Sequence, residues 1–248
     1  MTEFSTLPFL LAFEIGAFVW LWRRAGLRAG TLAALLLPLT AWVSATVAAS
    51  ASGWMRSETF LGLWPGFLLP VTPILLVALA CVWPPLRRDL TTLARRTPAR
   101  IWIALQIPRL AAIGTLIKTL RGEFPVHVQL AIGLGDLAFG ASALLLYWLA
   151  GRRLLSADAL VLWHAVGIAV VVLPGELAIQ AGLPGPFFIF DRPPTAEVML
   201  ELPMVLAPAF VVPVLLMFNA LGIVAALAER SREAMERPSG GGEVASIS

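Results

Sequence analysis

Four ionisable side chains lie deep inside long apolar stretches of this chain, and they are the residues whose types could do chemistry. They are Glu14, Arg109, Asp136 and Glu176. A charged side chain at the centre of a bilayer costs about 2.5–3.5 kcal/mol on insertion scales, so such residues are rare and mark functional sites by default. The chemistry open to them is recognition of an anion by a guanidinium group, or proton exchange at a carboxyl group.

Arg109 and Asp136 are expected to pair with each other. They lie in consecutive apolar stretches, at 101–120 and 128–149. At a rise of 1.5 Å per residue, they lie roughly 17 Å and roughly 12 Å from the helix ends that would face the same side of the membrane. Antiparallel neighbours would bring the two side chains within reach, and Gln106, one helical turn before Arg109, could join them.

Small residues and prolines surround this pair. Gly133, Asp136 and Gly140 share one helix face (i, i+3, i+7), where small residues allow close packing of helices. Proline breaks the backbone hydrogen-bond ladder, which membranes tolerate where neighbouring groups satisfy the freed carbonyls. We therefore expect a cavity at the depth of Asp136 and Glu176 that opens outward. The positions assigned to helix packing are Gly133, Gly135, Gly140, Pro203, Pro208 and Pro213.

The charge balance leaves two interpretations open. Glu14, Asp136 and Glu176 cannot all be ionised cheaply against Arg109 alone, so in a shared cavity at least one carboxyl group would hold a proton near neutral pH. This is the chemistry of a binding site coupled to protons. The alternative is a buried ion pair that only fixes helix packing, with a neutral carboxyl group making one hydrogen bond.

The elements that must position these residues are membrane-spanning helices. The chain of 248 residues is 59% hydrophobic and 13% charged, against about 25% charged in a soluble domain. We predict an all-α, polytopic transmembrane helix bundle over residues 1–228 and a cytoplasmic tail over 229–248 that begins helical and ends disordered. A spanning helix needs about 20 apolar residues. The seven expected spans are 6–22, 31–50, 60–83, 101–120, 128–149, 159–181 and 201–227.

The basic residues predict an orientation. Thirteen arginines, among them Arg153 and Arg237, lie in the connections on one side, and four basic residues lie on the other. The positive-inside rule then places the N-terminus outside and the C-terminus in the cytoplasm. All but one of the 18 basic residues are arginine, a bias typical of GC-rich bacterial genomes. We therefore expect the bacterial cytoplasmic (inner) membrane.

Two further patterns concern the membrane surfaces. Tryptophans at the ends of the expected spans are typical of an aromatic belt. They are Trp20, Trp22, Trp83, Trp148 and Trp163 on one side and Trp54 and Trp64 on the other. The segment 182–199, rich in proline and phenylalanine, is expected to form an outer loop or a re-entrant piece.

Several chemistries do not fit the sequence. The Gly133-Leu134-Gly135-Asp136 segment matches the GxGD motif of intramembrane aspartyl proteases, but no second aspartate lies inside a span to share a proton with it. His127 and His164 are expected near opposite membrane surfaces, so they cannot share a metal, and His164 is interpreted as an interfacial residue. No nucleotide-binding fingerprint occurs. We expect no cofactor, no metal and no nucleic acid.

Two segments resemble a group of bacterial multi-pass membrane proteins. Pro108-Arg109, then Gly122-Glu123-Phe124-Pro125, then Ile132-Gly133-Leu134-Gly135-Asp136 follow their pattern of an Arg-led helix, "G-x-L/F-P" and a "G-I/L-G-D" helix. Leu202-Pro203, Ala207-Pro208 and Val212-Pro213 are similar to their "LP…IP…VP" last helix. Asn219 stands where that helix would have a histidine, and Glu176 lies later than their polar residue. The resemblance implies a membrane class and a site location, and brings no activity with it.

Three functions follow from these observations. The first is non-enzymatic: a site formed by Arg109, Asp136, Glu14, Glu176 and Gln106 binds or moves a small solute, for which an anion suits the guanidinium group and proton coupling is an option. The second is a structural or accessory subunit of a larger membrane complex, with a membrane protein as partner. The third is an intramembrane enzyme, which would need a second acid close to Asp136.

Overall fold

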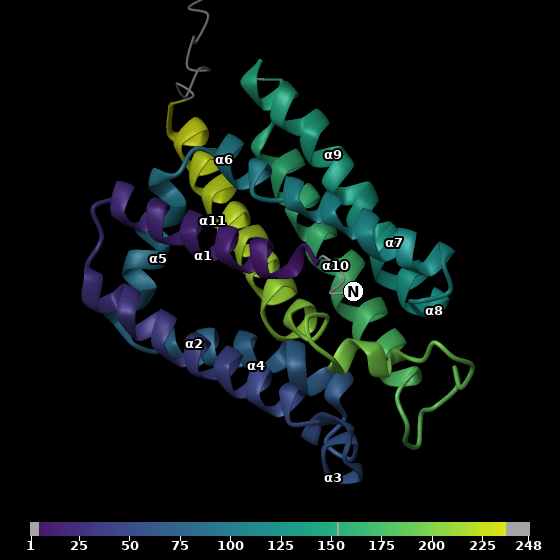
Figure 1. Ribbon diagram of the computed structural model, residues 1–248. Helices are drawn as coiled ribbons and strands as arrows, with labels where there is room; N and C mark the ends of the chain where they lie inside the picture. Colours follow the sequence, from purple (N-terminus) through teal and green to yellow (C-terminus); the bar gives the residue numbers. More distant parts are fainter. Residues whose placement is uncertain (1–4, 153, 237–248) are drawn as a thin grey trace, which may run out of the picture.

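The computed structural model describes residues 5–152 and 154–236, and every regular element in those ranges is a helix (Figure 1). The fold class predicted from the sequence, all-α, is therefore confirmed. The elements are α1 Leu7–Arg24, α2 Ala29–Ala51, η1 Trp54–Arg56, α3 Glu58–Leu61, α4 Pro65–Ala80, α5 Pro84–Arg96, α6 Ala99–Ala104, η2 Ile107–Ala112, α7 Ile113–Leu120, α8 Val126–Val128, η3 Gln129–Gly133, α9 Leu134–Gly151, α10 Ala157–Ala181, η4 Ala196–Leu200, η5 Ala207–Val211 and α11 Val212–Glu236.

Five helical segments in the described ranges are long and apolar enough to cross a membrane. They are Ala29–Ala51, Ala99–Leu120, Val126–Gly151, Ala157–Ala181 and Ala207–Arg232. A sixth exists if α4 and α5, which bend by 106° at their junction, count as one broken span. The prediction of seven spans is not supported, because α1 carries Glu14 and two terminal arginines within its 18 residues.

Helix α11 occupies the centre of the bundle. It packs against α10, α5, α6 and α4. In the most apolar stretch of the segment Ala207–Arg232, 67% of the residues are buried inside the protein. Figure 1 shows α11 running through the molecule, with α1, α2, α4 and α5 on one side and α7, α9 and α10 on the other. A cluster of buried side chains from α1, α2, α5, α6 and α11 packs around Phe218 and forms the largest core. This arrangement places Asn219 of α11 within hydrogen-bonding distance of Gln106, which follows α6, and of His164 of α10.

The fourth expected span is not one regular helix. Residues 101–120 were predicted as continuous, but a 3-10 segment, η2, separates α6 from α7. Pro108 lies at the start of η2 and cannot donate the backbone hydrogen bond that an α-helix requires there. Arg109 therefore projects from a tightened turn rather than from a regular helix.

Two π-helical turns interrupt other spans. They are η3 (Gln129–Gly133), before α9, and η5 (Ala207–Val211), before α11. Such turns occur frequently at functional sites. The last span also begins later than expected, because residues 201–205 form a bend and turns and the continuous helix starts at residue 206. Pro203 therefore precedes the span, whereas Pro208 and Pro213 lie at the starts of η5 and α11.

The connection after the third expected span is a helix, which the sequence analysis did not predict. In α5, Leu86, Leu90 and Leu93 recur on one face and are buried against the core, while the arginines occupy the remaining surface. Arg28, before α2, holds α5 by two hydrogen bonds to Asp89, from Nε at 3.1 Å and from Nη2 at 2.8 Å. These bonds hold the pKa of the Asp89 carboxyl group below its usual value of 3.8.

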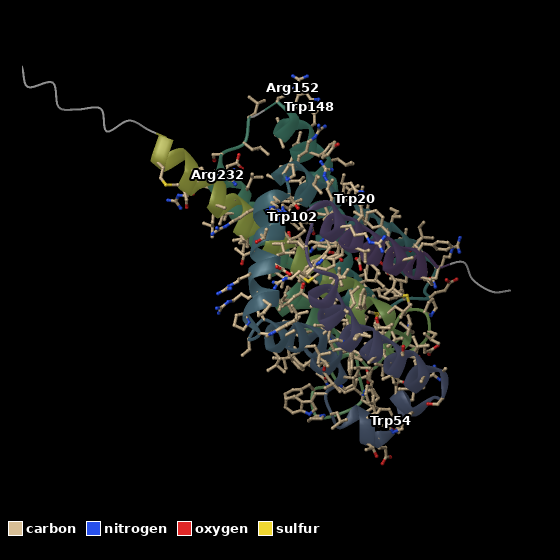
Figure 2. All side chains as sticks on the ribbon, turned by 90° about the vertical axis from the view of Figure 1, so that its left-hand side faces the viewer. Trp20, Trp54, Trp102, Trp148, Arg152 and Arg232 are labelled. Carbon is tan, nitrogen blue, oxygen red and sulfur yellow. The ribbon has the colours of Figure 1, made fainter. Side chains whose placement is uncertain are left out.

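The tryptophans fit an aromatic belt only in part. Figure 2 shows Trp148 and Arg152 at one end of the molecule and Trp54 at the other. Trp20, Trp54, Trp64, Trp83 and Trp148 are exposed. The prediction is wrong for Trp22, which is buried in the core, whereas Trp163 is half-buried and stacks on Phe139.

The remaining sequence predictions concern the segment 182–199 and the tail. Residues 182–195 form an irregular connection, in which Phe187 contacts Trp64 edge-on and Phe190 stacks on His127. Helix α11 continues past residue 228 to Glu236. The end of the tail from residue 237, with Arg237, and also Arg153 lie outside the described residues.

Candidate functional site

The structure brings Arg109 and Asp136 together. Arg109 Nη1 donates a hydrogen bond of 2.9 Å to Asp136 Oδ1, and this ion pair joins η2 to α9. Arg109 Nε donates to Gln106 Oε1 at 3.0 Å. The Arg109 side chain is 1% exposed and that of Asp136 is 13% exposed, so the arginine is enclosed while the aspartate borders open space.

A chain of buried polar side chains continues from Arg109 across the bundle. Asn219 of α11 donates from Nδ2 to the same Gln106 Oε1 at 3.1 Å, and its Oδ1 lies 2.9 Å from His164 Nδ1 of α10. All three of Gln106, Asn219 and His164 are at most 1% exposed. Of this network, only the contact between Gln106 and Arg109 is expected from the sequence. The prediction that His164 lies at the interface is wrong because the side chain lies inside the bundle.

Aromatic rings cover one side of the arginine. The Arg109 guanidinium carbon lies 4.8 Å from the centre of the Phe139 ring, which stacks on Trp163 with ring centres 4.4 Å apart. A cation over an aromatic face gains electrostatic stabilisation without a counter-charge. Phe139 therefore lets the guanidinium group stay charged with one carboxylate partner instead of two.

Glu14 approaches Arg109 from a different helix. Its carboxylate interacts electrostatically with Arg109 and is fully buried on α1. Neither Glu14 oxygen has a hydrogen-bond partner among the described residues, and the same holds for Arg109 Nη2. Buried polar atoms are almost always paired, so these three atoms are exceptions that call for a functional explanation.

The ion pair borders a cavity of about 310 Å³. Its wall includes Arg109, Asp136 and Glu176, and both π-helical turns contribute to it. The cavity also reaches the first residues of α1 and, at the end of α7, Lys118 and Arg121. Glu176 is half-buried on this wall, and no hydrogen bond joins it to the other acids among the described residues. Most of the remaining wall is apolar, as in pockets that bind small molecules.

Close helix packing explains one glycine of the predicted set. A Cβ atom at Gly140 would lie 2.9 Å from the backbone nitrogen of Leu110, next to Arg109. At Gly135 the nearest atom would be 3.5 Å away, an ordinary contact. Gly140 is therefore the position that lets α9 approach η2 closely enough for Asp136 to reach Arg109.

The described residues offer no group of three or more His, Cys, Asp or Glu side chains that could hold a metal ion. On the cavity wall they place two guanidinium groups, two carboxyl groups and one ammonium group. These groups can bind an anion and exchange a proton. The fold and the site thus describe a helical bundle of membrane type with a polar cavity between its helices.

The comparisons with known proteins place the chain in a family. The model of the family described as Domain of unknown function (DUF8737) matches residues 63–227, more than half of the chain, and the chain belongs to this family. The matched region contains the polar network from Gln106 to Asn219 but not Glu14. Searches of curated proteins and of solved structures each found no match.

Proposed function

We propose that this is a multi-pass membrane protein that binds a small anionic solute in the cavity beside Arg109 and moves it across the bilayer together with a proton. The observation that carries this proposal is the location of the ion pair. Arg109 and Asp136 border a cavity of about 310 Å³ instead of being packed dry among apolar side chains. A pair that served packing alone would gain from being sealed, because an open cavity forfeits contacts.

The proton is assigned to the carboxyl groups around this cavity. Glu14, Asp136 and Glu176 face Arg109 or the cavity, while Arg109 makes one carboxylate ion pair. When an anion enters, Arg109 gains a second negative partner, and a carboxyl group that takes up a proton restores the balance. Solute and proton would then move together without net charge.

The proposed topology has seven crossings in a bacterial inner membrane, with the N-terminus outside. In this arrangement α1 is the first crossing, and α4 with its sharp bend into α5 is the third. A helix of 18 residues is about 27 Å long, close to the hydrocarbon thickness of about 30 Å. Reporter fusions at residues 26 and 154 test the four crossings between them, because both sites should report the cytoplasm. A tag at the N-terminus tests α1, because it should be accessible from outside, and a cytoplasmic tag would remove α1 as a crossing.

Access to the cavity can be measured with a thiol introduced on its wall. Thr115 lines the cavity, and Cys81 can be replaced by serine to give a background without thiols. We expect Thr115→Cys in that background to react with a membrane-impermeant anionic methanethiosulfonate reagent. Ala143→Cys is the matched control, because Ala143 is fully buried in another cluster away from the cavity.

An equal lack of reaction in the Thr115→Cys and Ala143→Cys variants would contradict the proposal. A sealed Arg109–Asp136 pair would instead favour the role of a structural subunit, for which a partner membrane protein should then be sought.

A further inference from the structure

Gln129 lies on the cavity wall, and its amide group bonds to no other described residue. The side chain is 2% exposed, and neither its Oε1 nor its Nε2 has a hydrogen-bond partner among the described residues. Leaving a polar group buried without a partner costs about 1–3 kcal/mol, a cost that a leucine at this position would remove. Because Gln129 lines the cavity, a ligand is the partner that can repay this cost.

The backbone is shaped to hold this amide in place. A Cβ atom at Gly133 would overlap the amide group of Gln129, so that group lies directly over Gly133. Gly133 precedes Asp136 by three residues, which puts the amide about one helical turn from the ion pair. Both Gln129 and Gly133 belong to the π-helical turn η3, which aligns them with the cavity. The glycine therefore has a specific role, which is to make room for the Gln129 side chain.

Glu176 is brought to the same level by α10. The Cβ position of Gly175 lies 3.1 Å from the side chain of Ile132 in η3, and Glu176 follows Gly175 directly. The polar groups of the cavity are thus gathered near η3. Beyond them the wall is built from aliphatic side chains, among them Val171, Ile179 and Leu215.

The polar groups near η3 and the aliphatic part of the wall together define the chemistry of a ligand. An amide offers one donor and one acceptor side by side, and its complement is a group with one acceptor and one donor at the same spacing. A protonated carboxylic acid has this pattern: its carbonyl oxygen accepts from the Gln129 amide, and its hydroxyl group donates to the amide oxygen. The aliphatic wall suits a hydrocarbon body. The volume is at the small end of ligand pockets, which span about 300–1,000 Å³.

We propose that the ligand of this cavity is a monocarboxylic acid with a medium-length aliphatic body, and that Gln129 recognises its carboxyl group in the protonated form. This inference rests on the function proposed above and names the substrate class of that site. Lys118 and Arg121, on the wall at the end of α7, attract the anionic form at the cavity entrance. The acid enters as the anion and then takes up its proton from water or from a carboxyl group on the wall, so the proton that accompanies it crosses on the solute itself.

Three probes with similar aliphatic chains and different head groups test which head group the cavity recognises. Octanoate has the proposed head group, octanamide has the same donor and acceptor pattern without a charge, and octane-1-sulfonate is a permanent anion without a donor. We would measure how each slows the labelling of Thr115→Cys in phosphatidylcholine nanodiscs at pH 6. Octanoate and octanamide should protect the thiol, and the sulfonate should need a concentration at least about tenfold higher.

The variant Gln129→Leu distinguishes recognition from packing. It should weaken protection by octanoate about 10- to 100-fold and raise the melting temperature of the ligand-free protein, because a buried unpaired amide is removed. Gln180→Leu is the matched control. Gln180 is equally buried and its Nε2 also has no partner among the described residues, but its Oε1 accepts a hydrogen bond of 3.1 Å from the backbone nitrogen of Gly66 and it does not line the cavity. This control should not raise the melting temperature as Gln129→Leu does, because it leaves the Gly66 nitrogen without its acceptor, and it should leave protection unchanged.

Gly133→Ala provides a second variant if Gln129→Leu does not fold. It keeps the amide but displaces it, and should also weaken protection by octanoate. The proposal is overturned if the sulfonate protects as well as octanoate, if inorganic phosphate protects while octanoate does not, or if only phosphatidylglycerol added to the nanodisc protects. In the first two cases the cavity still binds a small anion and the proposed function stands, whereas protection by phosphatidylglycerol alone would make the occupant a lipid and contradict a small solute as well. A thiol at residue 115 that never reacts contradicts the proposed function itself.

Discussion

Two of the arginine–aspartate pairs in this bundle, Arg28–Asp89 and Arg109–Asp136, differ in what their remaining hydrogen-bonding groups do. Arg28 binds Asp89 through two nitrogens, Thr31 donates to the same carboxylate, and Arg28 Nη2 also donates to the carbonyl oxygen of Pro85. Arg109 binds Asp136 through one nitrogen and leaves Nη2 without a partner among the described residues. The Arg28 side chain is 58% exposed, whereas that of Arg109 is 1% exposed.

The number of unused hydrogen-bonding groups distinguishes a structural ion pair from a candidate binding site. In the outer pair, Asp89 uses its hydrogen-bonding capacity within the protein and fastens α5 to the start of α2. Inside the bundle, where an unpaired group costs far more, Arg109 and Gln129 keep unused polar atoms on the wall of one cavity, and Glu14 keeps both oxygens unpaired close to Arg109. Unsatisfied groups beside a cavity favour a ligand over packing.

The largest expected effect comes from breaking the inner pair. Arg109→Leu leaves Asp136 without its cation and should lower the free energy of unfolding by about 3–5 kcal/mol. Arg109→Leu combined with Asp136→Leu should recover most of that loss and still bind no octanoate. Denaturation in detergent, with labelling of Thr115→Cys as the binding assay, measures both properties. If the single variant were as stable as the parent, the pair would not exist in the membrane.

An intermediate effect is expected at Gly140. Gly140→Ala forces a methyl group against the backbone of Leu110 and should cost about 1–3 kcal/mol, with a loss of ligand protection because Arg109 is displaced. Gly135→Ala, on the same helix, meets only an ordinary contact and should be nearly neutral. Equal effects of the two substitutions would show that α9 does not approach η2 as described.

The smallest effect is expected at the outer pair, and it depends on pH. The pKa of Asp89 is lowered by its hydrogen bonds to Arg28, so this carboxylate stabilises the folded state at pH values above its usual 3.8. That contribution is lost as the pH falls through the lowered pKa. The melting temperature of the parent should therefore drop more steeply below pH 3.8 than that of Asp89→Asn. Parallel pH profiles for the two proteins would contradict this role of the pair.

The sequence carried the class of the fold and the central pair, because both depend on composition and on helical spacing. Asp136 and Arg109 could be paired from depth alone. Gln106 could be added because it lies one turn away. The arginines of α5 indicate only a connection between spans. The spacing of Leu86, Leu90 and Leu93 would have predicted the helix.

Other features could not be derived from local patterns. His164 and Asn219 lie on separate helices, and their contact depends on how α10 crosses α11. The resemblance singles out position 219, where asparagine stands in place of a histidine, but it does not predict the contact of Asn219 with His164. Gln129 carried no signal at all, because a lone glutamine near a helix start is ordinary, and its importance appears only once Gly133 and the cavity surround it.

The most direct test of the account is an experimental density map of the protein in a phosphatidylcholine nanodisc with octanoate, at side-chain resolution. We expect elongated density in the cavity, with the carboxyl group of octanoate within hydrogen-bonding distance of the Gln129 amide and close to Arg109 and Asp136. A cavity collapsed around a dry ion pair, with the Gln129 amide bonded to another residue of the chain, would contradict it.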